Sequence, residues 1–200
     1  MDTRQMLAEE RAELVSVLRT LSEEEWETPS LCAGWRVRDV AAHLQTDAVS
    51  LATYTGFLVR GRFSVDRVND VLVRRFAAEP PRALVDSLAA SNGWFTRMAP
   101  ALALADTFVH QQDIRRPLGR DREIPPERLA AVLSHPDPFA FPRRYTRGLR
   151  YVATDLEWSK GDGPEIRGPG EALALAMVGR SAALADLSGD GMPELRRRFA

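Results

Sequence analysis

The sequence contains a single cysteine, Cys32, and no hydrophobic run long enough to cross a bilayer. One cysteine cannot form an internal disulfide or a paired-cysteine zinc site. A transmembrane helix needs about 20 apolar residues in succession. The residues that follow Met1 are charged and helix-like, unlike the apolar core of a signal peptide. We therefore expect a cytoplasmic protein that has no membrane partner.

The sequence also lacks an excess of charge of one sign. Its 27 Lys and Arg residues and 28 Asp and Glu residues give a formal net charge of -1. Lys160 is the single lysine, a bias toward arginine that a GC-rich genome readily produces. Without a basic excess, the electrostatic signal of a nucleic-acid-binding protein is missing. We expect no nucleic-acid partner.

What is present predicts a protein with a hydrophobic core. A chain of 200 residues that is 44% hydrophobic and 28% charged can form one ordinary domain, or one domain with a modest appendage. Leucines at positions 7, 14, 18 and 21 recur with helical spacing, and prolines at 80 and 81 interrupt a later helical pattern. The spacing predicts helices over residues 3–21, 36–60, 64–78, 81–98, 101–116 and 126–133.

The pattern changes character near residues 134–138, which are rich in proline. Alternating side chains predict a strand within residues 149–157, and the turn residues 160–164 precede a returning strand over residues 165–167. An Ala- and Leu-rich helix is expected over residues 171–178. We therefore predict a mainly α protein with a helical bundle over residues 1–135 and a small α+β domain over residues 136–200.

The sequence contains three histidines, and two of them lie in segments with helical periodicity. Asp106 precedes His110 by four residues and Asp113 follows it by three, so all three share one helical face. His43 lies on the apolar side of an earlier helix, whereas His135 lies in the proline-rich segment. Spacing alone leaves two interpretations open: a metal site, or a satisfied histidine beside a solvated ion pair.

The metal interpretation has a definite geometry. His43 from one helix and the Asp106–His110 pair from a facing helix supply nitrogen and oxygen donors that suit zinc, with nickel, iron or manganese as alternatives. Three protein ligands leave a coordination position open. Asp113 or Asp39 could orient a ligand histidine through its second ring nitrogen, although Asp39 could equally serve the helix start. The interpretation fails if the two imidazoles lie more than about 8 Å apart.

Three segments resemble a known family. They are residues 26–44, with Gly34-Trp35 and His43; residues 105–119, with Asp106 and His110; and the tail from residue 155 to residue 191. Together they are similar to the mycothiol-dependent maleylpyruvate isomerase family, within the wider group of DinB-like metal-binding bundles. The resemblance implies a DinB-like four-helix bundle followed by a small C-terminal α+β domain.

The resemblance also implies a site. Its metal ligands correspond to His43, Asp106 and His110, and zinc is the expected ion. Asp106 is one methylene shorter than the glutamate of the family's founding isomerase, so that either the ion is displaced or Asp113 joins its ligands. Asp113 is also the candidate catalytic carboxylate, because no other general base is evident.

The cosubstrate implied by the resemblance is the thiol mycothiol. Its thiolate would add to an activated double bond of a small-molecule electrophile and leave after rotation, or would be transferred to the electrophile. Arg115, Arg116 and Arg147 are the candidates for binding the cosubstrate's polar groups.

Two other functions remain open at this stage. The bundle could bind a metal or ligand without catalysis, as a sensor or interaction module, or it could be a metal-dependent hydrolase. Cys32 is a weak candidate for a nucleophile, because no histidine lies near it in the sequence. The sequence is compatible with either a monomer or a homodimer.

Overall fold

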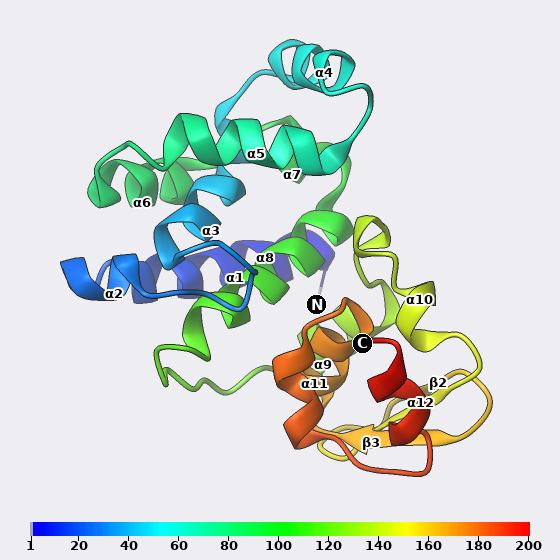
Figure 1. Ribbon diagram of the computed structural model, residues 1–200. Coiled ribbons are helices and arrows are strands. Elements are labelled where there is room, and N and C mark those ends of the chain that lie inside the picture. Colours follow the sequence, from blue (N-terminus) through cyan, green and yellow to red (C-terminus); the bar gives the residue numbers. More distant parts are fainter. Residues whose placement is uncertain (1) are drawn as a thin grey trace. The chain divides into compact units, whose positions relative to one another are not determined.

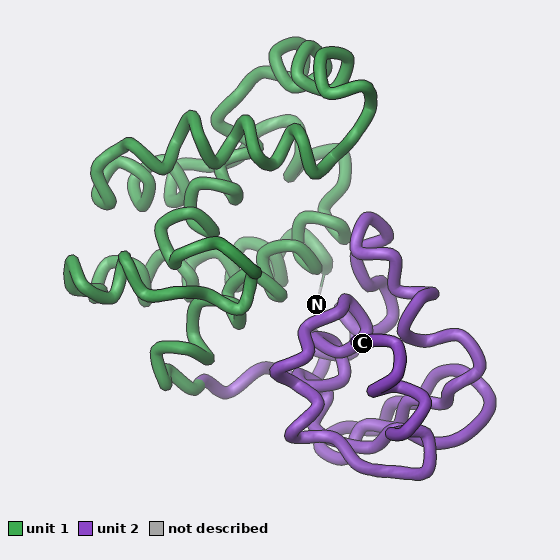
Figure 2. Tube along the Cα trace, viewed as in Figure 1, with its two compact units in different colours: residues 1–121 green, residues 122–200 purple. Residues whose placement is uncertain are grey.

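The computed structural model of the protein describes residues 2–200 and divides into two compact units, residues 1–121 and 122–200 (Figure 2). The first unit is helical (Figure 1). Its elements are α1 (Thr3–Leu18), α2 (Glu23–Glu27), α3 (Val37–His43), the 3-10 helix η1 (Leu44–Ala48), α4 (Leu51–Arg60), α5 (Val65–Phe76), α6 (Pro81–Ala90), α7 (Trp94–Met98) and α8 (Pro100–Arg115).

Four of these helices form a closed bundle. Helix α1 packs against α8 and α6, and α3 packs against the same two helices from the other side. The core between them consists of aliphatic side chains such as Leu14, Val40 and Leu88, together with Trp26 and Ile114. Helix α5 covers α3, and α4 packs on α5. The predicted four-helix bundle is confirmed.

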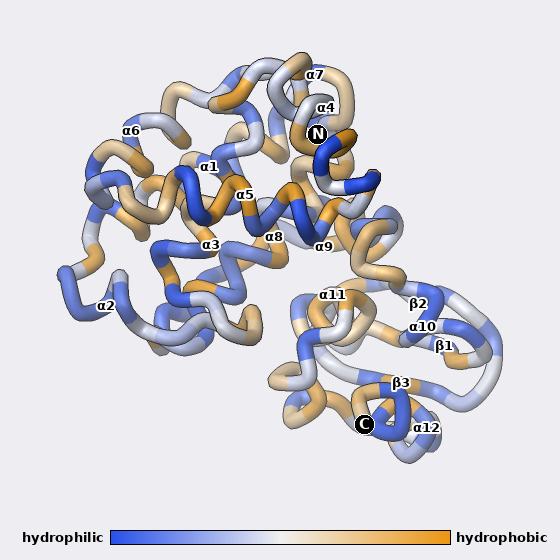
Figure 3. Tube along the Cα trace, turned by 45° about the horizontal axis from the view of Figure 1, so that its top comes forward, coloured by the Kyte–Doolittle hydropathy of each residue, from blue (hydrophilic) through white to orange (hydrophobic). Residues whose placement is uncertain are grey.

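The second unit is the predicted small α+β domain. Its elements are α9 (Pro126–Ser134), η2 (Pro138–Ala140), α10 (Arg143–Thr146), β1 (Arg150–Ala153), β2 (Ser159–Lys160), β3 (Glu165–Gly168), α11 (Gly170–Met177), η3 (Ser181–Asp186) and α12 (Met192–Arg197). Helix α11 contacts α9, β1 and β3. It is coloured largely hydrophobic in Figure 3, and all its residues except Glu171 are buried.

Two features of this unit differ from the prediction. The units divide after Asp121 rather than at residue 135, because α9 packs against α11. The strand over residues 165–168 does not return beside β1 as an antiparallel hairpin. It pairs in parallel with β1, in the sheet order β2-β1-β3, and β2 is the antiparallel neighbour.

Two predicted helices are each broken in the structure. The single helix expected over residues 36–60 is interrupted at η1, where Gln45 has non-helical dihedral angles. The Gln45 side chain donates to the carbonyls of Ala41 and Leu84 at 3.2 and 3.1 Å. The helix expected over residues 81–98 is interrupted at residues 91–93, between α6 and α7. No helix among residues 2–200 is long and apolar enough to cross a membrane.

Candidate metal centre

Helix α3 presents His43 to the bundle interior at its last residue. The helix starts sharply because the Asp39 carboxylate accepts hydrogen bonds from the Arg36 backbone nitrogen and from Arg36 Nε, both at 2.9 Å. Burial raises the pKa of Asp39, but the Arg36 hydrogen bonds and charge outweigh it and lower the pKa. Of the two roles left open by the sequence, Asp39 therefore takes the one at the helix start.

Helix α8 presents the other two candidate ligands. Pro100 occupies its first turn, where a missing backbone N–H has no cost. Asp106 and His110 are one turn apart on this helix, and Asp113 follows on the same face. Because α3 packs against α8, His43 faces this pair.

The three predicted ligands converge. His43 Nε2 and His110 Nε2 each lie 3.5 Å from the same oxygen, Asp106 Oδ1. The ring centroids of the two histidines are 4.6 Å apart, well inside the limit of about 8 Å. One donor atom from each residue lies within 4.8 Å of the other two. The side chains are between 9% and 17% exposed.

These distances can be compared with those of a coordinated ion. Four ligands arranged tetrahedrally about zinc at about 2.0–2.1 Å are about 3.3–3.4 Å from one another. The two 3.5 Å separations are close to this value and longer than a normal N–H···O hydrogen bond. The donor set of two imidazoles and one carboxylate therefore fits a divalent cation in both chemistry and spacing.

Asp113 contacts the other nitrogen of the His110 ring. His110 Nδ1 lies 2.9 Å from Asp113 Oδ2, an ordinary hydrogen-bond length, and the Asp113 side chain is fully buried. A carboxylate oxygen accepts, so His110 Nδ1 donates to Asp113 Oδ2, and Nε2 is the ring nitrogen that faces Asp106. This contact positions the ring in the way that carboxylates commonly orient metal-ligating histidines.

The surroundings shift the pKa values of Asp106 and His110 in opposite directions. Burial alone would raise the pKa of Asp106, but the His43 hydrogen bond and the charges of His43, His110 and Arg11 hold that pKa below its usual value. Burial alone would lower the pKa of His110, but hydrogen bonds to Asp113 and Cys32 raise it well above its usual value. The Asp106 carboxylate is therefore ionised at neutral pH.

Cys32 contacts His110 and Asp113, although it is far from both along the sequence. Its Sγ lies 3.0 Å from Asp113 Oδ2 and 3.7 Å from His110 Nδ1. The loop that carries it is tied to α8 because Leu31 N donates to the carbonyl of Asp113 at 3.1 Å. Near 80 positions separate these residues in the chain, so only the packing of the loop on α8 could reveal the contact. The expectation that no histidine is near Cys32 holds only along the sequence.

The three predicted arginines lie at or just after helix ends. Arg115 ends α8, and its Nη1 donates to the carbonyl of Arg120 at 3.3 Å. Arg116 follows as the C-terminal cap of that helix. Arg147 belongs to the second unit, where it caps α10 and is exposed. The structure thus brings together His43, Asp106, His110 and Asp113.

A four-helix bundle whose facing helices bring imidazole and carboxylate donors together has the architecture of metal-binding helical bundles. Residues 7–91 match the family model described as the mycothiol maleylpyruvate isomerase N-terminal domain. This match confirms the family resemblance indicated by the motifs, and it covers most of the helical unit.

Two crystal structures share the fold. They are the mycothiol-dependent maleylpyruvate isomerase and a mutant of that enzyme. Each is 13% identical in sequence, with a TM-score of 0.63 over 94% of this chain and 91% of that chain. No curated protein matches the chain significantly. At this identity the likeness establishes the fold alone. The chemistry has to be argued from the residues of the site.

Proposed function

We propose that this chain is a metal-dependent enzyme that uses a low-molecular-weight thiol, in the manner of the mycothiol-dependent isomerases. The observation that carries the proposal is the convergence of His43, Asp106 and His110 with 3.5 Å separations inside the bundle. The family match of the helical unit supports mycothiol as the thiol and a small electrophile as its reaction partner.

The three residues would hold a divalent cation, with zinc favoured by the mixed nitrogen and oxygen donors. When bound, such a cation lowers the pKa of a thiol and favours the thiolate, which is the nucleophile of isomerisation or thiol transfer. Three protein ligands leave a position open for that thiol.

The remaining residues of the site would not bind the cation themselves. They would orient its histidine ligands or bind the thiol. Asp113 holds the His110 ring in orientation by accepting from Nδ1 at 2.9 Å. We therefore assign Asp113 a positioning role rather than that of a fourth ligand. Trp35, whose ring centroid is 5.4 Å from that of His43, limits the freedom of the His43 ring. Arg115, Arg116 and Arg147 stay candidates for binding the polar groups of the thiol.

The first experiment is metal analysis of protein purified without a histidine tag, for the wild type, His110→Ala and His135→Ala. His135 is exposed and lies in the second unit, so this variant is the matched control. We expect one equivalent of metal in the wild type and in His135→Ala, and much less in His110→Ala. Full metal content in His110→Ala would refute the metal centre.

The second experiment separates catalysis from binding alone. Turnover of maleylpyruvate and of other electrophiles is measured with mycothiol, with and without zinc. A rate that requires both zinc and the thiol supports the proposal. Metal binding without turnover would favour a sensor or interaction module, and amide hydrolysis without any thiol would favour a hydrolase.

A further inference from the structure

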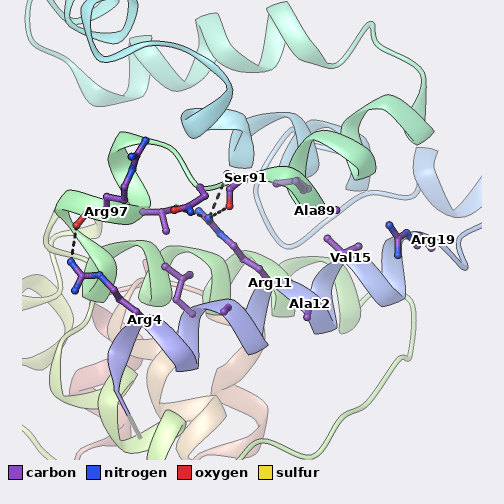
Figure 4. A pocket seen from close by; sticks show the side chains of 13 residues that line it. Arg4, Arg11, Ala12, Val15, Arg19, Ala89, Ser91 and Arg97 are labelled. Carbon is purple, nitrogen blue, oxygen red and sulfur yellow. Dashed lines mark hydrogen bonds between the residues drawn. The ribbon is translucent and has the colours of Figure 1, made fainter.

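A groove lined by four arginines runs along α1, on the side of this helix that faces α6 and α7. Its volume is about 500 Å³, within the range of small-molecule sites. Arg4 and Arg11 come from α1, Arg19 is the C-terminal cap of that helix, and Arg97 comes from α7. Figure 4 shows Arg4 and Arg97 at one end, Arg11 in the middle and Arg19 at the other end.

The sequence of α1 explains the shape of the groove. Positions 4, 8, 11, 12, 15 and 19 share one face of a helix, because they are separated by multiples of about one turn. Ala8 and Ala12 on this face, and Ala89 on α6, are too small to fill the space between the helices. Leu7, Val15 and Leu88 form a buried apolar floor.

The charge of the groove is of one sign. Among the described residues that line it, four are arginines and none is acidic. Arg11 is held by Asp47 at 3.3 Å, just outside the lining. Arg4 donates to the carbonyl of Arg97 at 3.2 Å, and Arg97 Nε to that of Gly93 at 3.1 Å, so neither guanidinium is neutralised by these contacts. Arg19 is exposed at the far end.

This groove is separate from the metal centre. Arg11 and Leu88 also line a second hollow that reaches Asp106, but its volume is only about 10 Å³, about that of one water. Leu14, Leu44 and Phe95 surround that hollow. A ligand of organic size in the groove therefore cannot reach the candidate metal ligands by this route.

We propose that the groove binds an elongated organic anion that has an apolar body and terminal carboxylates. Arginine pairs well with carboxylates, because its planar fork offers two parallel donors. Arg4 and Arg19 are 15 positions apart, which is about 22 Å along the helix axis. The two ends of the groove are therefore far enough apart to hold the two carboxylates of one long-chain aliphatic diacid, whose apolar body would lie over the floor.

The test uses the full chain and isothermal titration with dodecanedioate as the probe. Two compounds separate the contributions: 1,12-dodecanediol keeps the length without charge, and succinate keeps the charges without the apolar body. We expect one diacid per chain and at least tenfold weaker binding of both comparison compounds. Equal binding of the diol, or no binding of dodecanedioate, would overturn the proposal.

Variants locate the binding site. Ala12→Leu narrows the groove and should weaken dodecanedioate binding at least tenfold, and Arg19→Gln should weaken it about fivefold. The control is Arg82→Gln on α6, whose side chain is 93% exposed and does not line the groove. Circular dichroism verifies that each variant is folded. Unchanged affinity in Ala12→Leu would exclude this groove.

The outcome is independent of the metal centre. His110→Ala, which removes a candidate ligand, should bind dodecanedioate as the wild type does. Loss of diacid binding in His110→Ala but not in Ala12→Leu would place the anion at the metal centre and refute the groove.

Discussion

At the scale of single residues, the two nitrogens of His110 have different partners. Nε2 faces Asp106 at 3.5 Å, and Nδ1 faces Asp113 at 2.9 Å. The sequence predicted that Asp106, His110 and Asp113 share a face, because helical spacing is fixed. It could not tell which carboxylate faces which nitrogen, since that depends on how α3 and the loop around Cys32 pack against α8.

Removing the charge of Asp113 tests its positioning role. We expect Asp113→Asn to lower zinc affinity about 10- to 100-fold, because the carboxylate no longer fixes the His110 ring. Zinc affinity is measured by competition with a chromophoric chelator. Asp121→Asn, at an exposed position of the same unit, is the control and should bind zinc as the wild type does. Unchanged affinity in Asp113→Asn would show that the ring is fixed by other contacts.

At the scale of elements, Asp47 explains why two predicted helices are broken. Its carboxylate accepts from the backbone nitrogen of Phe95 at 2.7 Å and from that of Thr96 at 3.2 Å, at the start of α7. It also pairs with Arg11 on α1. A straight helix through residues 44–50 would not leave this carboxylate at the start of α7. The break at residues 91–93 has a local signal, because Ser91-Asn92-Gly93 is a turn-like sequence. Residues 44–49 contain no glycine or proline, so the first break has no such signal.

The Asp47 interactions predict a pH-dependent contribution to stability. Burial raises the pKa of Asp47, but hydrogen bonds from Thr96 and Phe95 and the Arg11 charge lower it below the ordinary value of 3.8. A lowered folded-state pKa stabilises the fold above the unfolded-state value, and this contribution is lost as pH falls through the folded-state value. Asp47→Asn should therefore reduce the free energy of unfolding by about 2 kcal/mol at pH 7.

Urea unfolding of the wild type and Asp47→Asn at several pH values measures this difference. It should be constant between pH 7 and about pH 5 and shrink below about pH 4. Asp66→Asn, an exposed residue of α5, is the control. A difference that grows with acidity would contradict the assigned sign.

Gly93 lies against Asp47 and tests the same junction. A Cβ at residue 93 would lie 2.7–2.8 Å from side-chain atoms of Asp47, too close without displacement of that side chain. We expect Gly93→Ala to destabilise the protein by about 1–3 kcal/mol, as overpacking does. In contrast, a Cβ at Gly56 on α4 meets only Arg60 Nη1 at 3.9 Å.

Gly56→Ala is therefore the matched substitution, and it should stabilise the protein by about 0.5–1 kcal/mol through helix propensity. Thermal denaturation of both variants provides the comparison. Equal melting temperatures for the two variants would show that Asp47 moves freely away from residue 93.

At the scale of the whole molecule, metal binding should appear as stability. A cation that binds the folded helical unit and not the unfolded chain adds about 2.7 kcal/mol when its free concentration is 100 times its Kd. We expect zinc to raise the melting temperature of the wild type by several degrees, and to leave that of His43→Ala nearly unchanged. His135→Ala should respond to zinc as the wild type does.

A zinc-induced shift that survives in His43→Ala would show that the ion binds elsewhere. Calorimetry is the appropriate measurement, because two compact units can unfold in separate transitions and only the helical unit carries the candidate ligands.

Local spacing was enough to predict the mainly helical class, the change to an α+β tail and the i, i+4 placement of Asp106 and His110. It could not predict that α9 packs with α11, that β3 runs parallel to β1, or that Cys32 contacts Asp113. These features join residues distant along the chain. Their positions are set by side-chain packing, which no local pattern records.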